Sequence, residues 1–304
     1  MKYAVAVLCL CSLAPAQNRR PANSRNFNIN TTGDATSCAD LHVTSRGELS
    51  QLNQTFTLTR GEAPLLELNV AEHGQIHVRG WDQPNYSVEA CKVAVADTRN
   101  AADAIARAVN VNHIAGNITF TGPTTDLGDW MVVFFVNAPR DATLNLEVHN
   151  GPMEVKGING PIRLRATNGP IAVSDCGGSV DVQSQNGPIA FNGDRGDVHL
   201  TAQNGPIAVN LSKETWNGSL LDVKTVNGPL AVNMPENFRS GMRLETSGHA
   251  PFSCQAVQCR DALTDNRSGN RTLQMNGAGD AIRLSAQNGP VAVSSSRQDR
   301  RGVR

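Results

Sequence analysis

Short apolar pairs recur at regular intervals through the second half of the chain. Between residues 150 and 210, apolar side chains fill the fourth and sixth positions of successive nine-residue units, with a polar or small residue between them. Such alternation predicts a β-strand with one buried face. The pairs are Met153/Val155, Ile162/Leu164, Ile171/Val173, Val180/Val182, Ile189/Phe191, Val198/Leu200 and Ile207/Val209.

A corner separates one unit from the next. Glycine keeps its place even where the surrounding triplet is lost, at Gly178 and Gly196. Asn and Gly accept left-handed backbone, and Pro suits the first residue of a strand because it has no N–H. We therefore expect one strand and one corner per unit, with glycine supplying unusual dihedral angles. The triplet Asn-Gly-Pro begins at Asn150, Asn159, Asn168, Asn186, Asn204, Asn227 and Asn288.

The spacing of the triplets predicts how the strands assemble. Asn150, Asn168, Asn186 and Asn204 are 18 residues apart, which is two units. We predict an all-β fold: a parallel β-solenoid with nine-residue rungs and about two strands per coil, plus one short helix. Burying two aliphatic side chains per rung contributes roughly 3–6 kcal/mol, and ordering the rung costs about as much, so stacking must supply the rest.

The repeat weakens between residues 233 and 270, which predicts looped excursions, and it resumes at Leu273/Met275. Upstream, we expect a partly disordered segment over 17–60 and the solenoid domain over 61–296. Within that domain, Asp97–Val109 predicts a short amphipathic helix with Asp97 as its N-cap. Residues 297–304 form a basic tail, either solvated or weakly attracted to acidic polymers.

The first 16 residues have the pattern of a secretory signal peptide. Lys2 precedes an apolar run from Tyr3 to Leu13, and Ala14-Pro15-Ala16 is a cleavage site, so the mature chain begins at Gln17. A buried N-terminal strand is the alternative. The apolar run is too short to span a bilayer, and so is the run over 131–136. We predict an exported protein of the periplasm, cell surface or extracellular space.

Removal of the signal leaves five cysteines, and an oxidising compartment permits disulfides between them. Cys254 and Cys259 can bridge one loop, and Cys38 with Cys91 is a possible second bridge, although sequence does not fix connectivity. Cys176 is then left over. A zinc site is the alternative, but no Cys-x-x-Cys or paired-His spacing supports it.

Composition narrows the classes of partner. The 27 Lys and Arg residues balance the 27 Asp and Glu residues, which argues against nucleic acid as the main partner. Only 4% of residues are aromatic while 27 are glycine, which indicates a thin core repeated many times.

Several segments together resemble a known family. The segment Leu66–Asp82, the strand leading into Asn137-Ala138-Pro139 and the rungs of the form x-x-Asn-Gly-x-Ile-x-Val look like the bacterial putative-adhesin family of unknown function. That family is also described as Toastrack-like and is similar to the head domain of proposed autotransporter adhesins. The resemblance covers about residues 65–293 and implies a β-solenoid that acts in adhesion, scaffolding or stress sensing at the cell envelope. It implies no catalytic residue. The Asn-Gly-Pro triplet is more regular here than in the family, and the family's frequent membrane anchor is not found.

The outward residues of alternate rungs form two rows on opposite faces. One row is uniform and small after its first member: Glu154, Ala172, Ala190 and Ala208. The other row mixes charges in Arg163, Asp181 and His199, and is the candidate binding strip, with a solvated face as the alternative.

Other residues suggest sites that their context does not support. Glu72, His73 and His77 are residues of types that bind metals. Their spacing would suit a helix, but this segment is predicted to be a strand interrupted by Gly74, so we expect surface histidines. The glycine of the tripeptide Arg195-Gly196-Asp197 belongs to the repeat, so the tripeptide is not evidence of a separate binding motif. Calcium bound in the turns would require an aspartate at the same position of every repeat, and the aspartates here do not recur at one position. We expect Trp81, Trp130 and Trp216 either to stack on sugars, if their rings are exposed, or to pack in the core.

These patterns predict an exported, non-enzymatic binding or scaffold protein of the cell envelope, without a cofactor or metal, whose partner is an unknown protein or glycan. One alternative is a β-helical enzyme acting on polysaccharide, with Arg163, Asp181 and His199 as the place to look. The other alternative is an envelope-stress sensing module.

Overall fold

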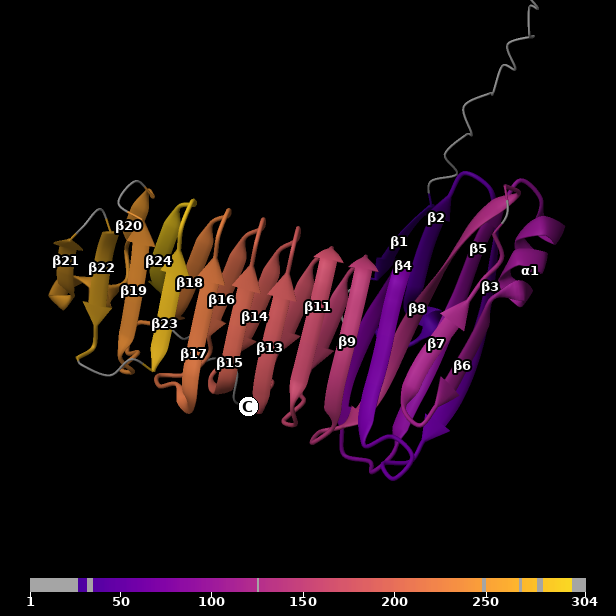
Figure 1. The fold of residues 1–304 in the computed structure, drawn as a ribbon, viewed down its shortest axis with the longest axis horizontal. Coiled ribbons are helices and arrows are strands. Elements are labelled where there is room, and N and C mark those ends of the chain that lie inside the picture. The colour runs from indigo at the N-terminus through magenta and orange to yellow at the C-terminus, as the bar shows by residue number, and fades with distance from the viewer. Residues whose placement is uncertain are drawn as a thin grey trace, which may run out of the picture.

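The computed structural model of the protein describes residues 27–31, 35–124, 126–247, 250–267, 270–277 and 281–296. The predicted signal peptide and basic tail lie outside these residues. Within them the chain is all-β apart from the helix α1 (Arg99–Ala108) and two short 3-10 turns, η1 (Cys38–Asp40) and η2 (Val257–Asp261). Most strands belong to two sheets, which we call sheet I and sheet II (Figure 1).

The long strand β4 (Leu65–Trp81) contributes to both sheets, residues 65–73 to sheet II and residues 74–81 to sheet I. In spatial order, sheet I consists of β3 (Glu48–Leu58), β5 (Tyr86–Ala96), β8 (Gly128–Pro139), β4, β10 (Met153–Lys156), β12 (Ile171–Ser174), β14 (Ile189–Gly193), β16 (Ile207–Leu211), β18 (Leu230–Pro235), β24 (Val291–Ser296) and β20 (Phe252–Cys254). Sheet II consists of β6 (Asn110–Ile114), β7 (Asn117–Thr121), β4, β9 (Thr143–Asn150), β11 (Ile162–Asn168), β13 (Ser179–Ser184), β15 (Arg195–Ala202), β17 (Asn217–Thr225), β23 (Ile282–Ala286), β19 (Met242–Ser247), β22 (Asn270–Met275) and β21 (Leu263–Arg267).

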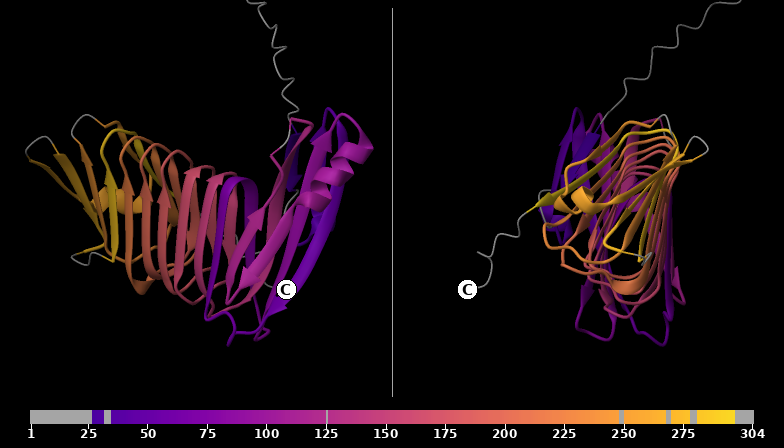
Figure 2. Two further views of the ribbon diagram at one scale, coloured as in Figure 1. Left: turned by 45° about the vertical axis from the view of Figure 1, so that its right-hand side comes forward. Right: turned by 90° about the vertical axis from the view of Figure 1, so that its left-hand side faces the viewer.

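Between β9 and β18 the chain passes alternately through the two sheets. Met153 of sheet I pairs in parallel with Ile171, and Ile162 of sheet II pairs in parallel with Val180, so one coil takes 18 residues at these positions. This confirms an all-β fold with two parallel-rich sheets in a solenoid-like arrangement. Seen from the end, the chain loops around a narrow interior (Figure 2).

The apolar pairs of the repeat fill this interior. Each pair lies directly on the pair of the neighbouring coil, so that Ile171 and Ile189 of sheet I face Leu164 and Val182 of sheet II within one continuous core. All four side chains are buried. A single coil has no such neighbours, and stacking therefore supplies the contacts that one coil cannot make alone.

The corner glycines allow close backbone approach rather than left-handed backbone. Of the glycines in the Asn-Gly-Pro triplets, only Gly151 has a positive φ, at 139°. A Cβ on Gly187 would lie 2.1 Å from the carbonyl oxygen of Gly169, and a Cβ on Gly205 would lie 2.2 Å from that of Gly187. The expectation of unusual dihedral angles therefore holds at Gly151 and at Gly196, whose φ is 111°, and was wrong for the other triplet glycines, where the coils stack too closely for any side chain.

The asparagines of the triplets form a hydrogen-bonded ladder along the same edge. Each side-chain amide donates to the side-chain carbonyl of the neighbouring coil: Asn168 to Asn150 at 3.0 Å, Asn186 to Asn168 at 3.0 Å and Asn204 to Asn186 at 2.9 Å. The ladder continues through Asn227 and Asn288. Asparagine is thus retained because it both donates and accepts along the stack.

The coils at the C-terminal end are not stacked in chain order. The last strands, β23 and β24, lie between β17/β18 and β19/β20 (Figure 1). Residues 242–247 and 252–254, expected to be looped excursions, instead form β19 and β20 beyond that final coil. Leu273 and Met275 belong to β22, which is antiparallel to β19, so the parallel repeat does not resume there as predicted.

Antiparallel strands close the stack at both ends. At one end β5 is antiparallel to both of its neighbours, β3 and β8, with α1 packed against these strands, and at the other end β22 and β21 form a hairpin. Sheet I ends instead at the parallel strand β20, which is only three residues long, so the described residues leave no long parallel edge for another chain to extend. The predicted helix is confirmed, but Thr98 is its N-cap, accepting a hydrogen bond from the Ala101 N–H at 3.3 Å.

Residues 35–60 are more regular than the sequence suggested. Partial disorder was expected there, yet β2 (Leu41–Ser45) and β1 (Phe27–Thr31) form a hairpin, and β3 pairs along its whole length with β5. The weak periodicity of this segment arises because β3 lies at a sheet edge, where both of its faces are largely exposed.

The cysteines pair as the sequence analysis considered. Cys38 is joined to Cys91 and Cys254 to Cys259, and Cys176 is a free thiol, fully buried in the core. The Cys176 thiol lies 3.4 Å from the carbonyl oxygen of Ser174, and burial raises the pKa of this thiol.

We predict that Gly187→Ala destabilises the protein by roughly 3 kcal/mol, because the added methyl group meets the Gly169 backbone. Urea unfolding followed by circular dichroism measures the change. Gly61→Ala is the matched control: a Cβ there meets nothing within 4 Å, so a change within about 0.5 kcal/mol is expected. Equal stability of the two variants would contradict the stacking role of the corner.

We also predict that Cys176 in the mature chain does not react with Ellman's reagent at pH 8 while the protein is folded. Its raised pKa favours the protonated thiol, and the thiolate is the reactive form. Because the folded state holds this proton more tightly, stability falls as pH rises above the ordinary thiol pKa of about 8.5. Unfolding in urea without reductant should release one titratable thiol, whereas rapid labelling of the native protein would refute the assignment.

Candidate functional site

The outer face of sheet I repeats the same residue types from strand to strand. The segments 170–174, 188–192, 206–210, 229–233 and 290–294 share the pattern Pro-x-Ala-x-Asn/Ser. Their strands β12, β14, β16, β18 and β24 are direct neighbours in register. The insertion of β24 beside β18 thus places the fifth copy next to the fourth, although the intervening chain is long.

The pattern produces a shallow groove, which we call the alanine trough. Alanines form its floor beside a row of Asn and Ser side chains, and the groove has a volume of about 490 Å³. Four of the floor residues are exposed although they are apolar. The floor residues are Ala172, Ala190, Ala208, Ala231 and Ala292.

Amides of one trough row are joined along the stack. The Asn210 amide donates to the Asn192 side-chain carbonyl at 3.4 Å, and the Asn233 amide donates to that of Asn210 at 3.0 Å. Ser294 continues the row, its hydroxyl lying 3.3 Å from the Asn233 side-chain oxygen. These bonds fix the orientation of each amide, so that the row presents ordered polar groups beside an apolar floor.

The outer face of sheet II has no such uniform row. It brings the predicted strip together in register: Arg163 beside Asp181, and Asp181 beside His199. The Arg163 Nε lies 3.6 Å from the Asp181 carboxylate, and His199 lies 3.3 Å from Asp197 and 3.7 Å from Asp222. Each member therefore has an oppositely charged or polar neighbour within the protein.

At its N-terminal end the alanine trough runs toward a raised wall. The β1–β2 hairpin and η1 cover the outer face of β5 and β8, where Ile29 and Leu41 pack against Val133 and Phe135. The Cys38–Cys91 disulfide ties η1 to β5.

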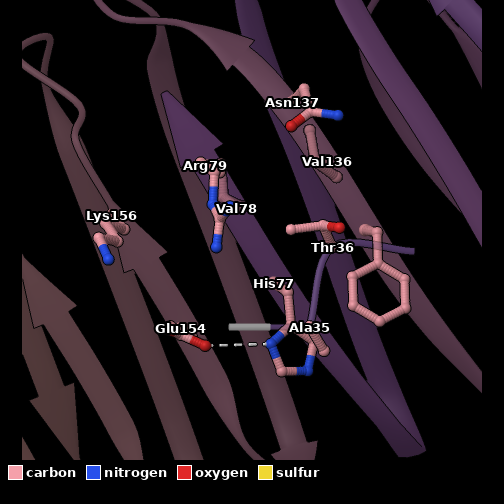
Figure 3. A pocket seen from close by; sticks show the side chains of 10 residues that line it. Ala35, Thr36, His77, Val78, Arg79, Val136, Asn137, Glu154 and Lys156 are labelled. Carbon is pink, nitrogen blue, oxygen red and sulfur yellow. Dashed lines mark hydrogen bonds and ion pairs between the residues drawn. The ribbon is translucent and has the colours of Figure 1, made fainter. Parts of the chain in front are cut away.

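A small pocket lies where this wall meets the sheet (Figure 3). His77 of β4 stacks on Phe135, with ring centroids 5.1 Å apart, and its Nδ1 lies 3.3 Å from the Glu154 carboxylate. Its Nε2 lies 3.3 Å from the Gln75 side-chain oxygen. His77 is only 9% exposed, so the expectation of a surface histidine was wrong here; Ala35 and Thr36, which precede η1, line the same pocket. Other lining residues include Thr36, Arg79, Asn137 and Lys156.

The remaining candidates from the sequence lie elsewhere. The side chains of Glu72 and His73 are outside the described residues. Trp216 is buried and Trp130 packs against Phe120, as core packing predicts, while Trp81 is half-exposed two residues after Arg79. Arg195 of the Arg-Gly-Asp tripeptide donates to the Asn159 side chain at 3.3 Å.

Two further observations describe the chain as a whole. Over the described residues, no three or more His, Cys, Asp and Glu side chains gather in a way that could hold a metal ion. None of the helices in the same residues has the length and apolar character needed to cross a membrane.

The sequence analysis identified the alanine row, but it chose the charged row of sheet II as the candidate binding strip. Two signals were available: alanine is unfavourable in strands, and the row is identical in successive repeats. The His77 pocket was not predictable from the repeat, because most of its lining comes from β4, β8 and the N-terminal segment, which lie outside the regular coils.

No protein-family model and no curated protein matches the chain. Two solved structures are similar to it at 10% identity and a TM-score of 0.32. One, a putative cell adhesion protein from Clostridium sporogenes ATCC 15579, covers 82% of this chain and 100% of its own. The other, a putative adhesin from Bacteroides fragilis NCTC 9343, covers 81% of this chain and 97% of its own.

Proposed function

We propose that the protein is an exported, non-enzymatic binding protein of the cell envelope, an adhesin that holds a linear glycan in the alanine trough. One observation supports this most directly. The outward residue of sheet I is alanine in five neighbouring strands, whereas the matching outward residue of sheet II changes from Arg163 to Asp181 to His199 to Asp222 to Arg283.

The contrast between the faces has a physical meaning. Both faces belong to the same 18-residue coils, so duplication alone would leave them equally uniform. Folding does not favour alanine, because strand propensity favours β-branched and aromatic residues at exposed positions. A constraint other than stability therefore maintains the small side chains of sheet I, and a flat ligand lying on the floor supplies such a constraint.

The chemistry of the trough suits a glycan better than an extended peptide. The alanines present apolar C–H surface, while the Asn and Ser row offers amide and hydroxyl groups that bond sugar hydroxyls. An extended peptide binds by adding a strand to a free sheet edge. The trough strands β14 and β16 are already paired on both sides.

The cysteine pairs support export. Two disulfides in one chain are typical of an oxidising compartment, and the predicted signal peptide agrees with this. We place the protein in the periplasm, on the cell surface or outside the cell.

Filling the trough should abolish binding. We predict that Ala190→Tyr combined with Ala208→Tyr weakens the retention of the protein by xylan and polygalacturonate at least tenfold in affinity gel electrophoresis, because two rings occupy the floor. The matched control is Gln183→Tyr with Thr201→Tyr, which adds the same rings to exposed outward positions of sheet II. Its retention should stay within twofold of the parent. Equal retention of both double variants, or a parent that neither polymer retains, would refute the proposal.

We further predict that the protein does not depolymerise these glycans. Incubation with each polymer should release no reducing ends above a buffer control over a day. Sustained release that disappears in His199→Ala would instead establish the polysaccharide-acting enzyme and place its site on sheet II.

A further inference from the structure

We propose that the protein forms a symmetric dimer in which β3 pairs antiparallel with the β3 strand of a second copy. This interaction surface is separate from the alanine trough and does not depend on the proposed function. β3 is the first strand of sheet I and lies at the opposite end of the stack from β20 and β21 (Figure 1). Among the described residues it pairs only with β5, so its other edge carries backbone N–H and C=O groups that a further strand can bind.

β3 has none of the features by which proteins protect a free edge. Protected edge strands are short, or they carry lysine, proline or a bulge. β3 is 11 residues long, its pairing with β5 runs without a register shift, and residues 49–58 contain no charged residue and no proline. The strands at the other sheet edges are shorter: β20 has three residues, and β6 and β21 have five each. Among the described strands, β3 is therefore the longest edge that is open to pairing.

The side chains of β3 alternate between a polar face and a partly apolar face. On the partly apolar face, the Gln54 amide donates to the Val111 carbonyl oxygen at 3.0 Å. The Phe56 ring stacks on His113, with ring centroids 4.4 Å apart. Leu52 lies on the same face and is 36% exposed. The exposed residues of the polar face are Gln51, Asn53, Thr55 and Thr57.

A two-fold axis at Gln54 matches both of these faces. Antiparallel pairing places residues of the same face opposite one another, so Leu52 lies against Phe56 of the second copy, and Phe56 lies against its Leu52. On the polar face, Asn53 lies against Thr55 of the second copy. The dimer thus buries the exposed Leu52 in two apolar cross-strand pairs, and it leaves polar groups beside polar groups.

The charges that flank β3 favour the same register. With this axis, Glu48 lies opposite Arg60 of the second copy, and Arg46 lies opposite its Glu62. The Arg60 side chain pairs with Asp141 but is 53% exposed, and its guanidinium has further N–H groups for a second carboxylate. Moving the axis one residue earlier places Arg46 opposite Arg60, and moving it one residue later places Glu48 opposite Glu62. Like charges that face each other across a pair of strands are destabilising.

The pairing joins sheet I of the two copies into one continuous sheet. The two-fold axis of an antiparallel edge is perpendicular to the sheet, so the outer faces of both copies lie on the same side. Both alanine troughs therefore open in the same direction, and the contact is closed because each copy uses the same edge once.

Sedimentation velocity of the mature protein should show a dimer that dissociates on dilution. Leu52→Lys should raise the dissociation constant at least tenfold, because it places a charge beside Phe56 of the second copy, while the melting temperature of the dissociated protein is retained. The matched control is Leu263→Lys, which adds the same charge at a 75% exposed apolar position on β21 and should stay within twofold of the parent. A parent that remains monomeric, or a dimer that Leu263→Lys disrupts and Leu52→Lys does not, overturns the proposal.

Cysteine crosslinking tests the register. Mild oxidation of Gln54→Cys should give a covalent dimer, because two Cα atoms on the axis lie about 5 Å apart. Thr57→Cys is the matched control on the same strand: its two copies lie about 20 Å apart and should not crosslink. Faster crosslinking of Asn53→Cys or Thr55→Cys than of Gln54→Cys refutes the axis at Gln54. Equal crosslinking of Gln54→Cys and Thr57→Cys indicates random collision and overturns the pairing.

Discussion

The whole structure depends on the distance at which one coil can approach the next. Backbone hydrogen bonds hold neighbouring strands about 4.8 Å apart, and the corners must accept the same spacing. At the Asn-Gly-Pro edge they do so because Gly169, Gly187 and Gly205 have no side chain to separate one corner from another. The stacked aliphatic core and the asparagine ladder both follow from this contact, since each requires identical positions to lie directly above one another.

The same stacking explains why the two outer faces can evolve differently. Inward residues must be apolar and corner residues must be small, but outward residues are not needed for the core. Sheet II uses that freedom for mixed charges that neutralise one another, as Arg163 does with Asp181. Sheet I instead repeats one small residue, and a repeated surface on a repeated scaffold matches a ligand that itself repeats.

Sequence alone predicted the features that arise within one coil. The alternation of Ile189 and Phe191 with Ala190 specified strand, buried face and exposed face together, and the 18-residue spacing specified parallel pairing. It could not predict that β24 lies beside β18, because the 290–294 segment would present the same local pattern at any place in the stack. Nor could it predict the burial of His77, which depends on long-range contacts such as its stacking on Phe135. The sequence located the corner glycines correctly, but it did not show why glycine is needed there, which is the close approach of the neighbouring coil's backbone.

The position of β23 and β24 sets an order of assembly. Coils from β9 to β18 can be added one after another as the polypeptide emerges, each onto its predecessor. The β19–β22 segment has no surface to join at that stage, because its neighbour is the later-synthesised β23–β24 pair. Completion of this end therefore waits until the final strands have been synthesised and inserted, which makes the last residues of the chain decisive for closing a part of the fold that is encoded before them.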